Sequence, residues 1–274
     1  MEKIGDWTTC YPFRSHWLEE PCGRTARLHY LDEGEGDTLL FVHGPATWSF
    51  HWRELIQAFR GRYRTISLDY SGCGLSGMPR PGYRYRPEDR IGELIQLIRQ
   101  LRLRQITLIA DDTAVVTALG VAVRTSRRMA RFVLIEPRWP SAENGFGLMS
   151  GPHAPCRIRR ILERNYPADA PAEVRGGYME PWNSWRRRCG LRRELRGWRR
   201  AMRERGTLTT LQEKLSIFAN YPVCLVSGGA KMNVEFPFVR SELYIIQNVM
   251  NSVETSPQRL EPILESFFER NPVF

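Results

Sequence analysis

The sequence of 274 residues is poor in lysine and histidine and contains no long apolar run. Lysine occurs at three of the 40 basic positions, Lys3, Lys214 and Lys231, so arginine carries nearly all of the positive charge. No stretch approaches the roughly 18 apolar residues that a membrane-spanning helix needs, and the first nine residues lack the apolar run of a secretory signal. These absences predict a cytoplasmic protein without a membrane span.

Metal and cofactor motifs are also absent from the sequence. The six cysteines are scattered without a close pair, which excludes a zinc knuckle and a Cys-x-x-Cys redox site and predicts reduced, packed thiols. Residues 72–77 match G-x-G-x-x-G after a predicted strand, but a dinucleotide site also needs a helix to begin there. Residues 78–82 contain two prolines and a glycine, which indicate a loop. We expect no metal and no cofactor.

Charge is distributed unevenly along the chain. The net charge is +10, and residues 157–205 hold 15 arginines against six acids. A basic surface of this kind attracts nucleic acid, anionic membranes or acidic proteins. A general preference for arginine explains the same excess, because lysine is rare throughout. We therefore expect no nucleic-acid binding and keep an acidic partner protein as an alternative.

The order of apolar patterns indicates an α/β protein. Hydrophobic residues make up 42% of the chain, enough to fill a sizeable core. Continuous apolar runs typical of strands buried on both faces occur at 38–43, 63–70, 105–110 and 132–136. Helical patterns occupy 91–101 and 114–123 between them. This alternation predicts a mostly parallel, doubly wound sheet.

The strand rhythm stops in the middle of the sequence. Residues 141–216 are rich in arginine and tryptophan and contain no strand-like run. A buried strand resumes at 221–228, and 242–247 and a helix bearing Leu260 to Phe268 follow. We predict a core formed by residues 1–140 and 217–274, with residues 141–216 inserted as a helical cap.

Several segments then share a family resemblance, in the right order and over nearly the whole chain. Residues 43–50 read His-Gly-Pro-Ala-Thr-Trp-Ser-Phe, and residues 28–36, 72–76, 106–112 and 174–185 carry further motifs. Together they resemble the haloalkane dehalogenases and the related β-lactone decarboxylases of long-chain olefin synthesis. The resemblance implies an α/β-hydrolase fold with an inserted cap and a pocket for a small apolar ligand between core and cap.

The resemblance assigns the nucleophile to Asp112. In that family a carboxylate at a sharp turn attacks carbon to form an ester, and a histidine then activates water to hydrolyse the ester. The family's His-Asp-Trp-Gly-Gly becomes Asp111-Asp112-Thr113-Ala114-Val115 here. From the residues alone, Asp112 is equally well explained as the N-cap of the helix that follows. Both interpretations stay open at this stage.

The groups that stabilise negative charge in the family are replaced in this sequence. Thr113 stands in place of the tryptophan and lacks an indole donor. Pro45 stands in place of the asparagine and lacks both the amide side chain and a backbone N–H. Loss of one such donor costs about 2.7–4 kcal/mol of transition-state stabilisation. The resemblance therefore implies a weakened first chemical step.

The base is missing as well. The histidines are His16, His29, His43, His51 and His153, and none lies in the last third of the chain. Asn251 aligns with the family's base, and a carboxamide accepts no proton near neutral pH.

The acid that orients the base in the family has two candidate positions. One is Glu136, and the other is occupied by Lys231. With no histidine to orient, pairing of Glu136 with an arginine is the simpler interpretation.

Three hypotheses follow. The first is a catalytically silent or strongly attenuated member that keeps its pocket. The second is an active hydrolase or β-lactone decarboxylase-like enzyme that uses Asp112 with a non-standard partner such as Glu136. The third is a binding module whose basic cap docks on an acidic partner.

Overall fold

The computed structural model describes residues 5–19, 27–138, 158–203, 211–228, 236–247 and 251–273. Eight strands form one sheet in the order β1-β2-β4-β3-β5-β6-β7-β8. In chain order they are β1 (His16–Leu18), β2 (Leu28–Glu33), β3 (Thr38–Val42), β4 (Arg64–Leu68), β5 (Ile106–Asp111), β6 (Met129–Ile135), β7 (Val223–Ser227) and β8 (Ser241–Ile245). Only β2 pairs antiparallel to its neighbours, and all other strand pairs are parallel. The predicted α/β-hydrolase fold is confirmed.

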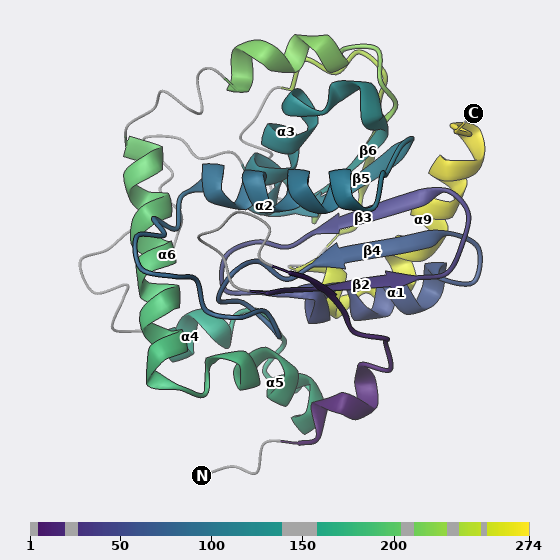
Figure 1. Cartoon of the computed structure of the whole chain (residues 1–274). Coiled ribbons are helices and arrows are strands. Elements are labelled where there is room, and N and C mark those ends of the chain that lie inside the picture. Colours follow the sequence, from purple (N-terminus) through teal and green to yellow (C-terminus); the bar gives the residue numbers. More distant parts are fainter. Residues whose placement is uncertain are drawn as a thin grey trace.

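Helices cover both faces of the sheet (Figure 1). Helices α2 (Pro87–Gln100) and α3 (Ala114–Arg124) pack together on one face, and α1 (Arg53–Phe59) and α9 (Pro257–Arg270) lie on the other. Every residue of β3 and β7 is buried, as continuous apolar runs predict. In the edge strand β8 the residues alternate between exposed and partly buried, and among the described strands only β7 pairs with it.

The described residues between β6 and β7 are helical and contain no strand. They form α4 (Ile158–Leu162), α5 (Ala172–Met179), the short 3-10 helix η6 (Glu180–Trp182), α6 (Trp185–Arg203) and η7 (Leu215–Phe218). Trp182 and Trp198 are buried at 2% exposure, whereas Trp185 is 73% exposed. The boundaries at 140/141 and 216/217 stay predictions. Helices α4, α5 and α6 lie to one side of the sheet, whereas η7 lies next to α3 (Figure 1).

Buried polar contacts fix the cap helices on the core. Arg90 of α2 and Glu194 of α6 form an ion pair of 2.7 Å in which both side chains are buried. The indole N–H of Trp48 donates to the carbonyl of Gly177, and the Asn165 amide donates to the carbonyl of Ala46, each at 2.9 Å. Breaking a buried ion pair by removing one partner costs about 3–5 kcal/mol. The cap is therefore held rigidly over the ends of the strands.

Residues 72–77 form turns, and the next helix begins at Pro87, so the loop interpretation of this glycine-rich segment is confirmed. Cys10, Cys73, Cys189 and Cys224 are free thiols. Within the described ranges, no helix combines the length and apolar character needed to cross a bilayer. No cluster of three or more potential ligand side chains is placed to hold a metal ion in the same ranges.

Candidate active site at the end of strand β5

The turn between β5 and α3 has the geometry of a nucleophile elbow. Asp112 follows the last residue of β5 and has a φ of +42°, the left-handed region that a non-glycine residue adopts at a conformational cost. Its backbone is held on both sides, since its N–H donates to Ile135 and its carbonyl accepts from Arg138. These two hydrogen bonds hold the strained turn against the end of β6 and the residues after it. The turn presents the carboxylate beyond the end of the sheet.

The structure excludes the alternative role of Asp112 as a helix cap. The N-cap position of α3 is Thr113, and no side chain makes a capping hydrogen bond there. Asp112 is half exposed and lies 3.3 Å from the guanidinium of Arg138. Partial removal from water raises the pKa of Asp112 to about 6, with Arg138 acting in the opposite direction and Asp111 adding to the rise. Asp112 is therefore an accessible and unusually basic carboxylate.

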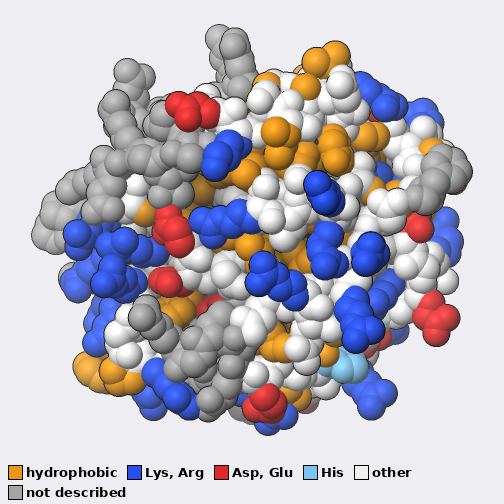
Figure 2. All heavy atoms as spheres, turned by 45° about the horizontal axis from the view of Figure 1, so that its top comes forward, with side chains coloured by type: hydrophobic (Ala, Val, Ile, Leu, Met, Phe, Trp, Pro, Cys, Tyr) orange, Lys and Arg blue, Asp and Glu red, His pale blue; other side chains and the backbone are white. Residues whose placement is uncertain are grey.

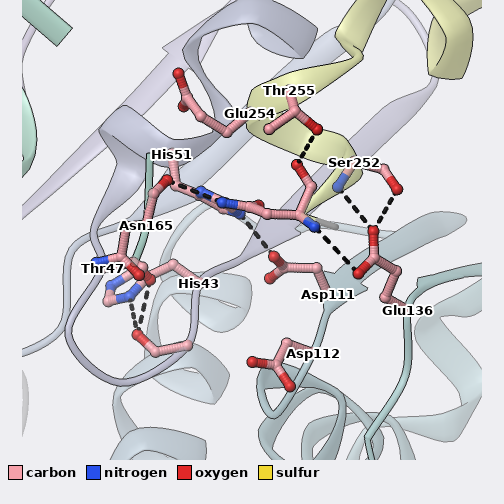
Figure 3. Close-up of polar contacts among 12 residues, drawn as sticks. His43, Thr47, His51, Asp111, Asp112, Glu136, Asn165, Ser252, Glu254 and Thr255 are labelled. Carbon is pink, nitrogen blue, oxygen red and sulfur yellow. Dashed lines mark hydrogen bonds and ion pairs between the residues drawn. The ribbon is translucent and has the colours of Figure 1, made fainter. Parts of the chain in front are cut away.

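The adjacent carboxylate, Asp111, points away from Asp112 (Figure 3), as strand alternation predicts. Its Oδ2 lies 2.7 Å from Nε2 of His51, a buried residue of the helix η2 (Ser49–Trp52). The other ring nitrogen of His51 lies 2.9 Å from the hydroxyl of Tyr178 in the cap. The site therefore contains a histidine next to the nucleophile position, but it bonds to the neighbouring carboxylate.

A count of protons places one of them on Nδ1 of His51. Tyr178 donates its single hydroxyl proton to Glu254, a carboxylate that Arg53 binds through two contacts of 2.7 Å. The hydroxyl oxygen can then only accept from His51, so Nδ1 carries a proton. Burial alone would lower the pKa of His51, but the Asp111 carboxylate raises it above the usual value. Both ring nitrogens of His51 are thus engaged, and the raised pKa favours its protonated form.

Glu136 stabilises a helix terminus. It follows β6 with a φ of +45°, and its carboxylate accepts the backbone N–H groups of Asn251 (3.2 Å) and Ser252 (2.7 Å) and the Ser252 hydroxyl. Ser252 opens the short helix α8 (Ser252–Thr255), where a negative charge is favourable. The simpler interpretation, an ion pair with arginine, is wrong, because backbone amides supply the positive partners.

Asn251 occupies the position expected for the base, at the same edge of the sheet. It has a φ of +58°, and its side-chain amide donates to the carbonyl of Asn165 at 2.9 Å. Together with the Asn165 contact to Ala46, this bond joins α8, the cap and the loop after β3. Asn251 therefore serves as a structural bridge with no proton-accepting group.

These residues surround a pocket of about 520 Å³ between core and cap. Asp111, Asp112, Glu136 and Asn251 line it from the core, and residues 164–167 line it from the cap. Among the described lining residues, His51 is the only imidazole. Pro45 and Thr113 also line the pocket, next to Gly44, where an added Cβ would lie 3.4 Å from the Thr113 hydroxyl.

Comparison with known proteins is consistent with this geometry. Residues 39–235 match the model of the alpha/beta hydrolase family. The chain belongs to the alpha/beta hydrolase family. It is 30% identical over 208 residues to a cis-3-alkyl-4-alkyloxetan-2-one decarboxylase of Shewanella oneidensis and 34% identical over 166 residues to haloalkane dehalogenase 2 of Mycobacterium tuberculosis. These matches cover 68% and 58% of the chain.

The matches span 63% and 57% of those two relatives, so less than two thirds of either. Among solved structures, the haloalkane dehalogenase DbeA of Bradyrhizobium elkani superposes with a TM-score of 0.80 at 19% identity, covering 94% of this chain and 98% of that one. At this identity the superposition establishes the fold alone. The resemblance to dehalogenases and lactone decarboxylases inferred from the sequence is confirmed.

For this alpha/beta hydrolase, the structure brings together Pro45, Thr113, Asp112, Glu136 and Asn251 around one pocket, as the sequence predicts. The roles of these five residues stay predictions. Lys231 and His153, which the sequence also singles out, lie outside the described residues.

Sequence reasoning missed the group formed by His51, Tyr178, Glu254 and Arg53. Its signal was weak. The histidine adjoins a recognisable turn, but the contacting members of this group lie 76 to 201 residues apart in the chain.

Proposed function

We propose that this chain is a ligand-binding alpha/beta hydrolase whose turnover is abolished or strongly attenuated, because none of the described residues that line the pocket offers an unengaged base to hydrolyse an ester at Asp112. Two observations carry the proposal: Asn251 stands at the position of the family's base, and both ring nitrogens of His51 are engaged by Tyr178 and Asp111, with a raised pKa that favours the imidazolium form. An amide and an imidazolium both lack a lone pair that accepts a proton at neutral pH.

The first half-reaction is retained in principle. An oxygen of the Asp112 carboxylate can attack a saturated carbon, so that a carbon–oxygen bond forms and a carbon–halogen bond breaks, with the electron pair leaving on the halide. The strained φ, half exposure and raised pKa of Asp112 support this step. Pro45 and Thr113 supply neither the amide nor the indole donor of the family, and each loss slows the step by about 10²–10³.

The second half-reaction lacks an unengaged base among the described residues that line the pocket. Hydrolysis of the ester needs a water molecule whose proton is removed as its oxygen attacks the carbonyl carbon. Glu136 is held by the α8 backbone amides, and Asp111 is paired with His51. An alkylated Asp112 would therefore persist.

The names of the relatives suggest ligands of two kinds for this pocket: haloalkanes and dialkyl β-lactones. We propose a small molecule with an alkyl body and one electrophilic carbon. The pocket of about 520 Å³ is within the size range of small-molecule sites.

Intact-mass analysis after incubation with reactive iodoalkanes and β-lactones tests the proposal. Wild type is expected to gain slowly one group mapped to Asp112, an alkyl group from an iodoalkane or the whole ring-opened molecule from a β-lactone, while Asp112→Ala gains none at that position. As a gain-of-function arm, Asn251→His is expected to shorten the lifetime of the adduct, since histidine tolerates the left-handed backbone found there. Rapid turnover by wild type that Asp112→Ala abolishes would contradict the proposal.

A further inference from the structure

Helix α6 concentrates positive charge on the cap. Its 19 residues include nine arginines and a single acid, Glu194. Glu194 is 3% exposed and neutralises the buried Arg90 of the core, so it does not offset the arginines at the surface. Figure 2 shows basic side chains on the side of the molecule where α6 lies in Figure 1, and others across the rest of the face that it draws. The outer face of this helix is therefore strongly cationic.

The arrangement of residues around the helix axis separates two faces. Successive residues are about 100° apart. Leu191, Leu195 and Trp198 are buried on one face, against the core and the other cap helices. On the opposite face the exposed residues are Trp185, Arg186, Arg193, Arg196 and Arg200. We call these five residues the α6 outer face.

The α6 outer face forms a row about 22.5 Å long, at a rise of about 1.5 Å per residue. Trp185 stands at one end of the row and is 73% exposed, although a large apolar ring is normally buried in a monomer of this size. An indole beside a row of guanidinium groups is typical of a protein surface that binds the interface of a lipid bilayer. Tryptophan partitions to the headgroup level, and arginine extends to the anionic headgroups.

We propose that the α6 outer face docks on the surface of an anionic lipid bilayer, with α6 lying parallel to the membrane plane. Nucleic acid fits this surface less well, because proteins that bind single strands without sequence preference use several aromatic rings interleaved with the basic groups. In the described part of α6, Trp185 is exposed, whereas Trp198 is buried. A single planar row of cations also suits a flat surface better than a groove. This docking is independent of chemistry at Asp112.

Membrane electrostatics give the expected size of the preference for anionic over neutral vesicles. Each arginine close to an anionic bilayer strengthens partitioning by about fivefold. Three arginines therefore account for about a hundredfold difference between anionic and neutral vesicles. The attraction is screened by salt over about 10 Å at 0.1 M, so it weakens steeply between low and moderate ionic strength.

Vesicle sedimentation of the full chain tests the proposal. The probes are vesicles of phosphatidylcholine alone and vesicles in which about one third is phosphatidylglycerol, a content that gives a strongly negative surface. Wild type is expected to bind the anionic vesicles at least tenfold more tightly. The triple variant Arg186→Glu/Arg193→Glu/Arg196→Glu is expected to lose that preference.

The matched control is Arg104→Glu/Arg124→Glu/Arg127→Glu, three exposed arginines outside α6 with the same total change of charge. It is expected to keep most of the binding, and thermal melting checks that both triple variants are folded. If the α6 variant is unfolded, the corresponding Arg→Gln triple variant replaces it. Equal weakening by the two charge reversals, or equal binding to both vesicle types, would overturn the proposal.

Tryptophan fluorescence distinguishes docking on a bilayer from binding to other polyanions. Anionic vesicles are expected to shift wild-type emission to shorter wavelength, and the Trp185→Phe variant should show a clearly smaller shift. Tight binding of a single-stranded RNA oligonucleotide without any binding to anionic vesicles would assign the surface to nucleic acid and refute membrane docking.

Discussion

The adjacent carboxylates Asp111 and Asp112 should respond in opposite ways to the same change, Asp→Asn. Asp111 is the anion of a buried ion pair, with its side chain 14% exposed and that of His51 3% exposed. Asp112 is half exposed and partly desolvated, with a raised pKa. Each substitution removes one negative charge and keeps the shape of the side chain, so each variant controls for the other.

Removal of one partner from a buried ion pair costs about 3–5 kcal/mol. The loss for Asp111→Asn should lie near the lower limit, about 3 kcal/mol, because the amide oxygen can still accept from His51. For Asp112, a shift from 3.8 to about 6 corresponds to about 3 kcal/mol of destabilisation of the ionised form. Solvent screening of the half-exposed side chain reduces this to about 1 kcal/mol. Asp112→Asn should therefore stabilise the fold slightly.

The two effects also differ in pH dependence. The pKa of His51 is raised by folding, so the ion pair stabilises the protein fully below about pH 6.5, and this contribution is lost as the pH rises through the folded pKa. The pKa of Asp112 is also raised, so its penalty is absent below about pH 4 and complete above about pH 6.

Urea denaturation at pH 5.5, 7 and 9 provides the assay. The deficit of Asp111→Asn should be largest at pH 5.5 and smallest at pH 9, while Asp112→Asn should gain most at pH 7 and above. Equal stabilities of the two variants at pH 7, or a deficit of Asp111→Asn that grows with pH, would refute the ion-pair assignment.

Three further substitutions test the contacts that position the site. Tyr178→Phe removes the hydroxyl shared by two buried partners and should lower the unfolding free energy by about 1–3 kcal/mol in chemical denaturation. Glu136→Gln should cost about 1–2 kcal/mol and increase amide hydrogen exchange at the start of α8, with exchange unchanged there if the carboxylate has no such role. Gly177→Ala places a methyl group 2.1 Å from the buried ring of Phe50 and should lower the melting temperature by several degrees, whereas Gly61→Ala, with open space around it, should not.

The sequence was sufficient to predict the parallel sheet, because buried strands such as β3 and β7 are continuous apolar runs. Helix α2 was equally accessible, since Pro87 begins it and its apolar positions repeat with helical spacing. The left-handed turn at Asp112 could be inferred only from resemblance. Nothing local distinguishes an aspartate at a strained turn from one that caps a helix, and backbone hydrogen bonds to the end of β6 and the residues just after it decide between them.

The buried polar group could not be predicted. Arg53 and Glu254 are 201 residues apart, and in its own segment of sequence each looks like an ordinary surface charge. Glu136 likewise has partners that are backbone amides, which no side-chain pattern reveals. Both sets of contacts depend on how α8 packs against α1 and the end of β6, which only the tertiary structure determines.

The number of halide ions released per chain tests the central claim most directly. Wild type and Asp112→Ala are incubated for hours with an excess of a reactive iodoalkane, and iodide is measured against protein concentration. The account predicts that iodide release dependent on Asp112 does not exceed one equivalent per chain, because the ester is not hydrolysed. Release of many equivalents by wild type, abolished in Asp112→Ala, would contradict it.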